Sequence, residues 1–225
     1  MPTPTFFRLP DERRNRLVNE AIVEFSDRSY TEASLSQIAR RASIPKGSVY
    51  QYFEDKLDLY RWLLTDEAPR RKREFVGAAS QEGDFWTRLE TFIERGMAFL
   101  VEHPRLARLS AAAAAPTAVV EVRGLYKAIC EAGIVELRAV LEEGARSRAL
   151  GALKASELDI ATRFVATVIG PGLTDVVLQE LGAELHEVLA SDALRKRLNL
   201  KRRKALAHQA VLFIRSGLGS ERKTG

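Results

Sequence analysis

The sequence contains very little cysteine. A single cysteine, Cys130, among 225 residues excludes an internal disulfide framework and fits a reducing compartment. Cys130 stands between Ile129 and Glu131 in a helical pattern, which favours an unreactive, buried thiol over a redox sensor. The sequence also lacks an uninterrupted run of the ~18 apolar residues that a membrane-spanning helix requires, and its first four residues do not begin a signal peptide. We therefore expect a soluble cytoplasmic protein without a membrane partner.

Signals for catalysis are equally scarce. The three histidines, His103, His186 and His208, lie far apart in the sequence. The segment 184–187 carries metal-capable side chains, but they do not all share one helix face and no second ligand set appears. The sequence has no Gly-rich phosphate loop after a strand and no nucleophile elbow. It therefore predicts a protein that is not an enzyme and that has no metal site and no cofactor.

The excess of positive charge is small. The chain has 35 basic and 30 acidic residues, and the net charge of +5 suits an anionic partner without identifying one. A hydrophobic content of 46% is ample for a core, and the length allows one large helical domain or a small domain plus a larger one. Composition agrees with nucleic-acid binding, but only a motif can indicate it.

Residues 34–53 carry the most informative pattern, two short helices joined by a tight turn. Ser34 is expected to cap the first helix, and Gln37 stands at capping-box spacing. Pro45 suits the first position of the second helix, where its missing N–H costs nothing. The apolar face of the first helix comprises Leu35, Ile38, Ala39 and Ala42. This pattern predicts a helix-turn-helix unit.

The second helix of the unit has an apolar and a polar side. Val49, Tyr50 and Phe53 are predicted to dock on the first helix. The residues then left outside are Lys46, Gly47, Ser48, Gln51 and Tyr52. Their cation, hydroxyl, amide and phenol suit close approach to phosphates and base edges. The alternative is an ordinary helical hairpin with a solvated face, and spacing alone does not separate the two.

Amphipathic helices flank this unit on both sides. One begins after Pro10 and carries an apolar stripe that ends near Asp27, and another follows Glu54-Asp55-Lys56. The flanks and the unit together predict a compact bundle of four helices in roughly the first seventy residues.

The residues that stand out in this region are Ala21-Ile22-Val23-Glu24-Phe25, Tyr30, Ser34-Leu35-Ser36-Gln37-Ile38-Ala39, Pro45-Lys46-Gly47-Ser48-Val49-Tyr50-Gln51-Tyr52-Phe53 and Lys56. In this combination the sequence resembles the N-terminal domain of the TetR family of transcriptional regulators, over roughly residues 10–65. The resemblance implies an all-α, TetR-like fold. A helix-turn-helix DNA-binding domain over residues 10–70, with its motif at 34–53, would precede a ligand-binding and dimerisation domain over residues 74–219.

The resemblance also implies a function. The protein would be a homodimer that binds a palindromic operator in double-stranded DNA, as a repressor, and that releases the operator when a small-molecule effector binds. Lys46, Gly47 and Ser48 would begin the recognition helix in the major groove, and Lys46, Ser48 and Gln51 would read bases. Contacts to the DNA backbone or bases are implied for Ser34, Ser36, Tyr50, Tyr52 and Lys56.

Alternatives and departures accompany these assignments. Tyr50 could belong to the core, and Ser34 could be a helix cap rather than a DNA contact. Ser29 and Ser43 stand at helix ends where the family usually has glycine, and Pro45 replaces the usual serine cap of the recognition helix. These departures leave the motif in place.

Helical periodicity continues beyond residue 74. A long helix is predicted from Val119 to Arg148, and Gly170-Pro171-Gly172 predicts a kink or a split helix. The apolar residues of 157–181 and 205–214 are the implied dimer interface. An effector pocket for an apolar or amphipathic ligand is predicted, and core packing is the alternative for each of its specificity groups. These groups are Trp86, Arg95, Tyr126 and Cys130.

The main rival is a helical ligand-binding or adaptor protein that keeps the TetR fold without operator binding. A damaged recognition helix would distinguish that protein, and in this sequence the recognition helix is intact. The sequence therefore favours a sequence-specific, DNA-binding transcriptional regulator.

Overall fold

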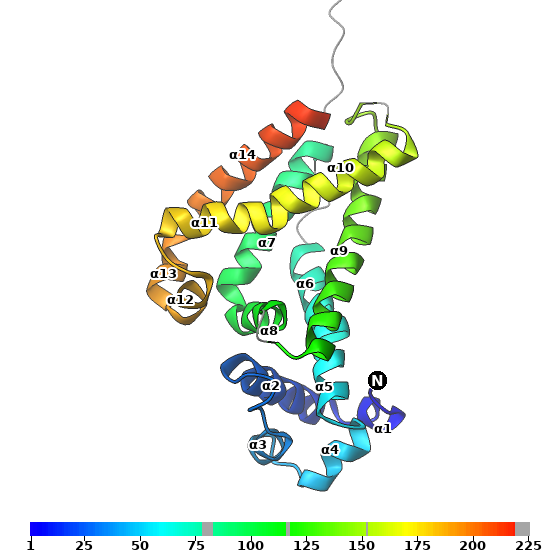
Figure 1. Ribbon diagram of the computed structural model, residues 1–225, viewed down its shortest axis with the longest axis vertical. Coiled ribbons are helices and arrows are strands. Elements are labelled where there is room, and N and C mark those ends of the chain that lie inside the picture. Colours follow the sequence, from blue (N-terminus) through cyan, green and yellow to red (C-terminus); the bar gives the residue numbers. More distant parts are fainter. Residues whose placement is uncertain (78–82, 116–117, 152, 219–225) are drawn as a thin grey trace, which may run out of the picture. The chain divides into compact units, whose positions relative to one another are not determined.

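A computed structural model of the chain describes residues 1–77, 83–115, 118–151 and 153–218. The regular elements of these residues are all helical, which confirms the predicted all-α class (Figure 1). The chain packs into two compact units. Met1–Arg71 and His103–Ile129 form the first, and Lys72–Glu102 and Cys130–Gly225 form the second. The division into a DNA-binding domain that ends at residue 70 and a ligand-binding domain that begins at residue 74 stays a prediction.

The first unit begins with a short helix, α1 (Pro4–Phe7), and a long one, α2 (Asp11–Asp27). The helices that follow are α3 (Leu35–Arg41), α4 (Lys46–Tyr52), α5 (Lys56–Trp62), the π-helical turn η1 (Leu63–Glu67), α6 (Ala68–Gly77), α8 (Pro104–Ala114) and α9 (Val120–Arg146); α6 and α9 continue into the second unit. Two acidic residues in the first turn of α2 favour the positive end of its dipole. Helix α2 buries the predicted apolar stripe, namely Leu17, Val18, Ala21, Ile22 and Phe25.

Helix α8 packs against α2 within the first unit. A guanidinium nitrogen of Arg108 on α8 donates to the Asp27 carboxylate at 3.1 Å. The buried Tyr60 of α5 donates a long hydrogen bond, 3.5 Å, to the carbonyl oxygen of Leu109. Burial of the phenol raises the pKa of Tyr60 to about 12. Polar and apolar contacts therefore both hold α8 to the N-terminal helices.

The second unit is built around α7 (Phe85–Glu102) and α14 (Leu200–Leu218), which pack against each other. Arg203 of α14 donates to the Glu94 carboxylate of α7 at 2.6 Å, and both side chains are largely buried. Helix α9 packs closely here, because a Cβ on Gly144 would lie 2.6 Å from the ring of Phe85. Only glycine allows the helix backbone to approach the ring this closely.

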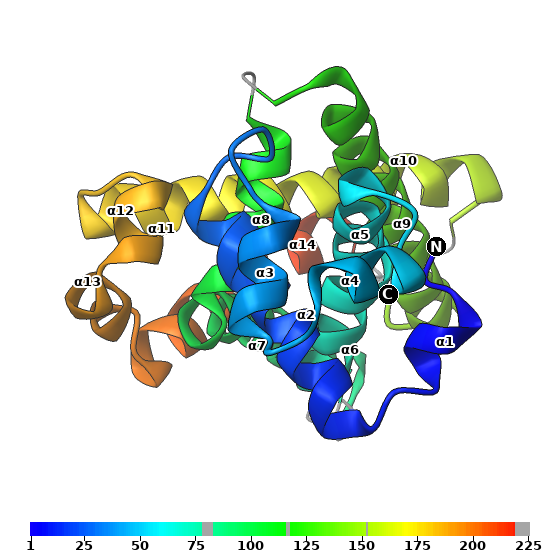
Figure 2. The ribbon, with the colours of Figure 1, turned by 90° about the horizontal axis from the view of Figure 1, so that it is seen from below.

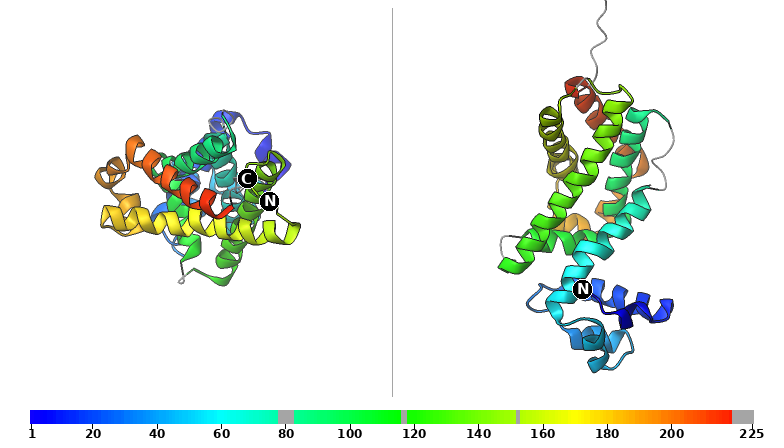
Figure 3. Two further views of the ribbon diagram at one scale, coloured as in Figure 1. Left: turned by 90° about the horizontal axis from the view of Figure 1, so that it is seen from above. Right: turned by 90° about the vertical axis from the view of Figure 1, so that its right-hand side faces the viewer.

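The remaining helices of the second unit are α10 (Ala155–Thr167), η2 (Val168–Gly172), α11 (Leu173–Leu181), α12 (Leu185–Ala190) and α13 (Asp192–Arg197). Figure 3 shows α10 and α11 beside α14, and Leu173, Val177 and Leu181 share a hydrophobic cluster with Ala207 and Val211. The α10–α11 stretch therefore packs one side against α14.

The predicted break at Gly170-Pro171-Gly172 takes the form of the π-helical turn η2. The helical path continues through this turn, so of the two predicted outcomes the split helix is wrong and the kink stays a prediction. A local π-turn is a common way for a helix to continue past a proline, which has no N–H to donate. The resulting stretch, Ala155–Leu181, is long and apolar enough to cross a membrane by length and composition, with a mean hydropathy of 1.3 in an 18-residue window within it. Charged residues interrupt this stretch, so it contains no continuous apolar run of about 18 residues.

Candidate nucleic-acid interface

The turn between α3 and α4 holds the two helices in a helix-turn-helix arrangement. Ser43 has a left-handed backbone, φ 56°, the conformation that makes glycine the favoured residue at this helix end, so serine keeps the geometry of the turn at some local strain. The buried Ile44 donates its N–H to the carbonyl of Ala39 at 3.0 Å. Pro45 is the N-cap and not the first helical residue, since its ψ of 139° is extended. Lys46 therefore begins the second helix.

The buried face of α4 differs from the one predicted. Tyr52 is 5% exposed and packs inward with Val49 and Phe53, whereas Tyr50 is 52% exposed. The expected positions of the two tyrosines are thus reversed, because residues i, i+3 and i+4 form one face and these are 49, 52 and 53. The alternative that placed Tyr50 in the core is wrong. A DNA contact by Tyr52 stays untested, and its ring is part of the core.

Most of the other residues predicted to contact DNA lie at the surface. Lys46, Gly47, Gln51 and Ser36 are exposed, and Ser48 is half-buried. Figure 2 views this part of the first unit from below and shows α3 beside α4. The sequence analysis missed Arg40, which is exposed and lies one turn after Ser36 on α3. The i, i+4 spacing of these two residues is the signal that could have revealed a second polar row beside α4.

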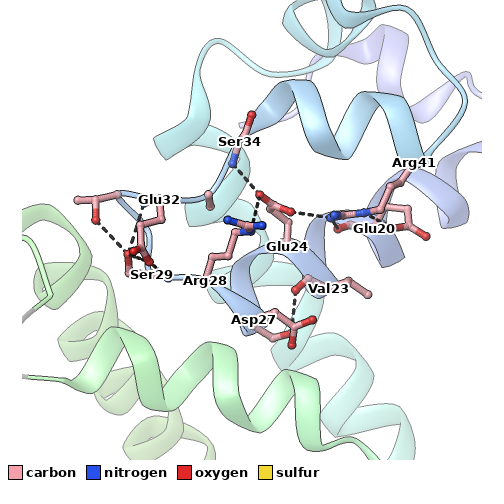
Figure 4. Close-up of polar contacts among 12 residues, drawn as sticks. Glu20, Val23, Glu24, Asp27, Arg28, Ser29, Glu32, Ser34 and Arg41 are labelled. Carbon is pink, nitrogen blue, oxygen red and sulfur yellow. Dashed lines mark hydrogen bonds and ion pairs between the residues drawn. The ribbon is translucent and has the colours of Figure 1, made fainter.

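A buried carboxylate fixes α3 to α2. Glu24 of α2 is 2% exposed, and its Oε1 accepts the backbone N–H of Ser34 at 2.9 Å (Figure 4). Its Oε2 accepts from Arg41, in the last turn of α3, at 2.8 Å. The Arg41 guanidinium also donates to Glu20 at 2.8 Å, and Arg28 lies 3.6 Å from Glu24. One carboxylate thus holds the helix at both its first and its last turn.

This carboxylate replaces the predicted capping box. Ser34 occupies the N-cap position, but its side chain makes no capping bond, so the prediction that its hydroxyl caps α3 is wrong. The Glu24 carboxylate accepts the Ser34 N–H instead, from a distant part of the chain. The hydroxyl of the half-buried Ser34 is therefore not used for capping.

The charge of Glu24 is stabilised by its partners. Burial alone would raise the pKa of this carboxyl, but the Ser34 N–H, the Arg41 guanidinium and the charge of Arg28 together hold the pKa below its ordinary value of 4.5. The carboxylate is therefore ionised at neutral pH, and its hydrogen bonds are charge-assisted.

Lys56 has a structural role in the DNA-free protein. Its ammonium donates to the carbonyl oxygens of Thr31 and Ala33, each at 3.1 Å. It also lies 4.7 Å from the ring centroid of Tyr30, a distance suited to a cation–π contact. These contacts tie α5 to the segment before α3. The predicted phosphate contact by Lys56 stays a prediction.

The residues predicted for the effector pocket have varied surroundings. Trp86 is buried in the cluster of the second unit, and Arg95 stacks 3.8 Å from the ring of Phe75 and donates to its carbonyl at 2.8 Å. Tyr126 is half-buried in the first unit. Cys130 is exposed, so the prediction of a buried thiol is wrong. The described cluster of the second unit begins on α9 only at Leu137, beyond the reach of Cys130.

A surface hollow occurs elsewhere, in the first unit. Its lining consists of Val23, Glu24, Asp27, Arg28, Glu32 and Arg41. This charged lining does not match the apolar effector pocket that the sequence predicted, so the pocket residues stay a prediction.

The geometry of α3 and α4 defines a helix-turn-helix protein with a polar, exposed second helix. A family model described as bacterial regulatory proteins, tetR family, matches residues 17–62. Residues 17–62 therefore match the TetR family of transcriptional regulators, which is not a family of enzymes, and the chain shares the all-α fold of that family.

Individual relatives support this assignment. The transcriptional activator FasR of Mycolicibacterium smegmatis is 48% identical over 58 residues, which cover 25% of this chain and 26% of FasR. The chain thus matches about a quarter of the length of this curated relative. A TetR-family regulator from Chloroflexus aurantiacus has 25% identity and a TM-score of 0.64 over 98% of this chain and 100% of its own. The regulator FadR of Bacillus subtilis, solved with stearoyl-CoA, shares the fold at 17% identity and a TM-score of 0.62, over 90% and 98% of the two chains.

The Glu24 network leads to a test of stability against pH. Replacing Glu24 by Gln keeps the size of the side chain and removes its charge, so we expect a loss of about 1–2 kcal/mol at pH 7, limited by the partial exposure of Arg41. Since the pKa of Glu24 is lowered by folding, the contribution of its charge is present above pH 4.5 and disappears as the pH falls through the folded-state pKa. Urea unfolding at pH 7 and at a pH below the folded-state pKa of Glu24 measures both effects.

The matched control is Glu12→Gln. Glu12 is an exposed carboxylate on the same helix, paired only with Arg16 among the contacts described. Its replacement should change the free energy of unfolding by no more than about 0.5 kcal/mol. A Glu24→Gln variant that loses the same stability at both pH values would contradict the assignment.

Proposed function

We propose that the protein binds a palindromic operator in double-stranded DNA as a homodimer in the cytoplasm, and that it represses transcription until a small-molecule effector releases it. The observation that carries the proposal is the division of α4. Its buried face anchors the helix, while Lys46, Tyr50 and Gln51 are exposed on the other side. This arrangement offers a cation, a phenol and an amide to a groove of DNA.

The geometry of the helix-turn-helix does not determine whether the protein represses or activates transcription. The FasR relative is described as an activator, and its match covers 25% of this chain. The helix-turn-helix lies within residues 17–62, the region that the family model matches. That region sets where the protein binds, whereas the position of the operator relative to the promoter sets the outcome. Repression is our proposal because an operator that overlaps a promoter excludes polymerase by occupancy alone.

Operator binding is tested by a gel shift on the DNA flanking the protein's own gene, at several salt concentrations. We expect a sequence-selective complex that weakens as salt increases, because phosphate contacts release counterions. The double variant Lys46→Ala with Gln51→Ala should lose selectivity between operator and unrelated DNA and keep the fold, since both side chains are exposed. Each lost base contact should cost about 1–3 kcal/mol.

The absence of any salt-sensitive, selective complex would favour the rival, a helical ligand-binding or adaptor protein of this fold. A selective complex whose operator preference survives the double variant would instead show that other residues read the bases. Ser29→Ala, in the exposed turn that follows α2, serves as the folded control that should bind as the wild type does.

Dimerisation is proposed from the apolar surface of the second unit. Phe164 is 71% exposed on α10, and other large apolar side chains are exposed on α10, α11 and α14, namely Ile160, Val176, Leu212 and Phe213. These are the segments predicted to form the dimer interface. Exposed apolar side chains gathered on neighbouring helices are typical of a surface that another protein covers. A dimer would present two recognition helices, which must lie about 34 Å apart to enter successive major grooves.

Replacing Phe164 by Glu together with Phe213 by Glu should convert the dimer to the 25.1 kDa monomer and weaken operator binding. Light scattering after gel filtration measures the mass. The control, Ser156→Glu, introduces a charge at an exposed polar position of α10 and should leave the dimer intact. A wild-type chain of monomer mass would refute the proposed dimer. Wild-type protein that partitions into lipid vesicles would assign this apolar surface to a membrane.

The effector is proposed to be apolar or amphipathic. The support is the hydrophobic cluster of the second unit and the stearoyl-CoA bound to the FadR structure that shares this fold. Adding stearoyl-CoA to the gel shift should weaken the operator complex, while free coenzyme A should not, because only the acyl chain provides apolar area. Unchanged operator affinity together with an unchanged melting temperature would refute this ligand class.

A further inference from the structure

The segment that precedes α2 reaches the end of the recognition helix. Thr3 donates its backbone N–H to the carbonyl of Tyr52 at 2.9 Å, and its hydroxyl donates to the carbonyl of Gln51 at 2.7 Å. These carbonyls belong to the last two residues of α4. Figure 2 shows α1 beside that end of α4. Residues 3–7 lie outside the region 17–62 that the family model matches.

The end of α4 needs such donors. The last four carbonyls of a helix have no partner within the helix, and a left-handed cap residue commonly supplies one. Here the residue after the helix, Phe53, is extended with φ −134°, so this cap is absent. Helix α4 has only seven residues, and short helices have little stability of their own. Thr3 therefore supplies, from outside the helix, the hydrogen-bond donors that the residues directly after α4 do not provide.

An aromatic side chain anchors the same segment. Phe6 is 0% exposed, and its ring centroid lies 5.1 Å from those of Phe53 and Trp62. Both contacts have the edge-to-face geometry that aromatic rings prefer. Phe6 thus links the residue that ends α4 to α5. The two residues act on the same helix end, one through hydrogen bonds and one through packing.

We propose that Thr3 and Phe6 are positioning residues that hold the C-terminal end of the recognition helix in its DNA-binding orientation. The exposed Tyr50 and the readout candidate Gln51 lie in this last turn, so disorder there would reach the proposed contacts directly. This inference rests on the proposed operator binding for its effect on affinity. Its effect on the order of α4 is independent of DNA.

The test compares variants of Thr3. Thr3→Val removes the hydroxyl and keeps the shape, and we expect about fivefold weaker operator binding, which corresponds to about 1 kcal/mol. Thr3→Ser keeps the hydroxyl and should restore wild-type affinity. Thr5→Val is the matched control, because Thr5 is an exposed residue of α1, the short helix that Thr3 precedes, and no hydrogen bond of its side chain is described. Circular dichroism at the assay temperature verifies that each variant is folded.

The circular dichroism measurement separates a loss of operator affinity from a loss of folded protein. A loss of about 1 kcal/mol leaves a protein of ordinary stability almost entirely folded, so a merely stabilising role for Thr3 would leave operator affinity unchanged. Unchanged affinity in Thr3→Val, with a wild type that does bind, would therefore overturn the inference. Phe6→Leu keeps an apolar side chain and loses the ring contacts, and it should weaken binding in the same direction.

Hydrogen exchange of the DNA-free protein gives a second readout. The amides of residues 52–54 should exchange about fivefold faster in Thr3→Val than in the wild type, and those of α8 should not change. Equal exchange at residues 52–54 would overturn the inference. A wild type that binds no operator would refute the proposed function, and the exchange measurement would still decide whether Thr3 orders the end of α4.

Discussion

The helix-turn-helix unit depends on one buried charge, the carboxylate of Glu24. Placing a carboxylate in the interior costs several kcal/mol unless donors surround it, and here the donors come from both ends of α3. Because Ser34 and Arg41 share the same acceptor, α3 can neither slide nor rotate on α2 without leaving a buried charge unpaired. Glu24 therefore defines the orientation of α3, and through the short turn that follows it also defines where α4 begins.

The recognition helix is held on three sides. Val49, Tyr52 and Phe53 pack into the core, the left-handed Ser43 and the buried Ile44 set its entry, and the segment at Thr3 and Phe6 closes its exit. A seven-residue helix would not keep its shape alone, since nucleation is costly and few hydrogen bonds repay it. This support is the physical condition for presenting a fixed pattern of donors and acceptors to DNA.

The second unit combines a closely packed interior with a surface that exposes large apolar side chains. The ion pair of Arg203 with Glu94 and the close contact at Gly144 tie α7, α9 and α14 together inside it. The α10–α11 stretch contributes Leu173 and Val177 to that interior, yet it leaves Phe164 exposed. A helix with apolar side chains on both sides buries one side within its own chain and leaves the other for a partner. The proposed homodimer follows from this division.

The sequence by itself determined the all-α class, the stripe of α2 and the helix-turn-helix, because periodicity and turn residues act over a few neighbouring positions. It also indicated the family, through the residues of α3 and α4. The helical spacing of 49, 52 and 53 also decides which tyrosine faces outward, whereas tertiary structure decided that Glu24 rather than Ser34 satisfies the start of α3 and that Cys130 is exposed. It also decided that Thr3 reaches the end of α4. These outcomes depend on contacts between residues 10 to 49 positions apart, or on how far the hydrophobic core extends along α9. A pattern of neighbouring residues predicts neither.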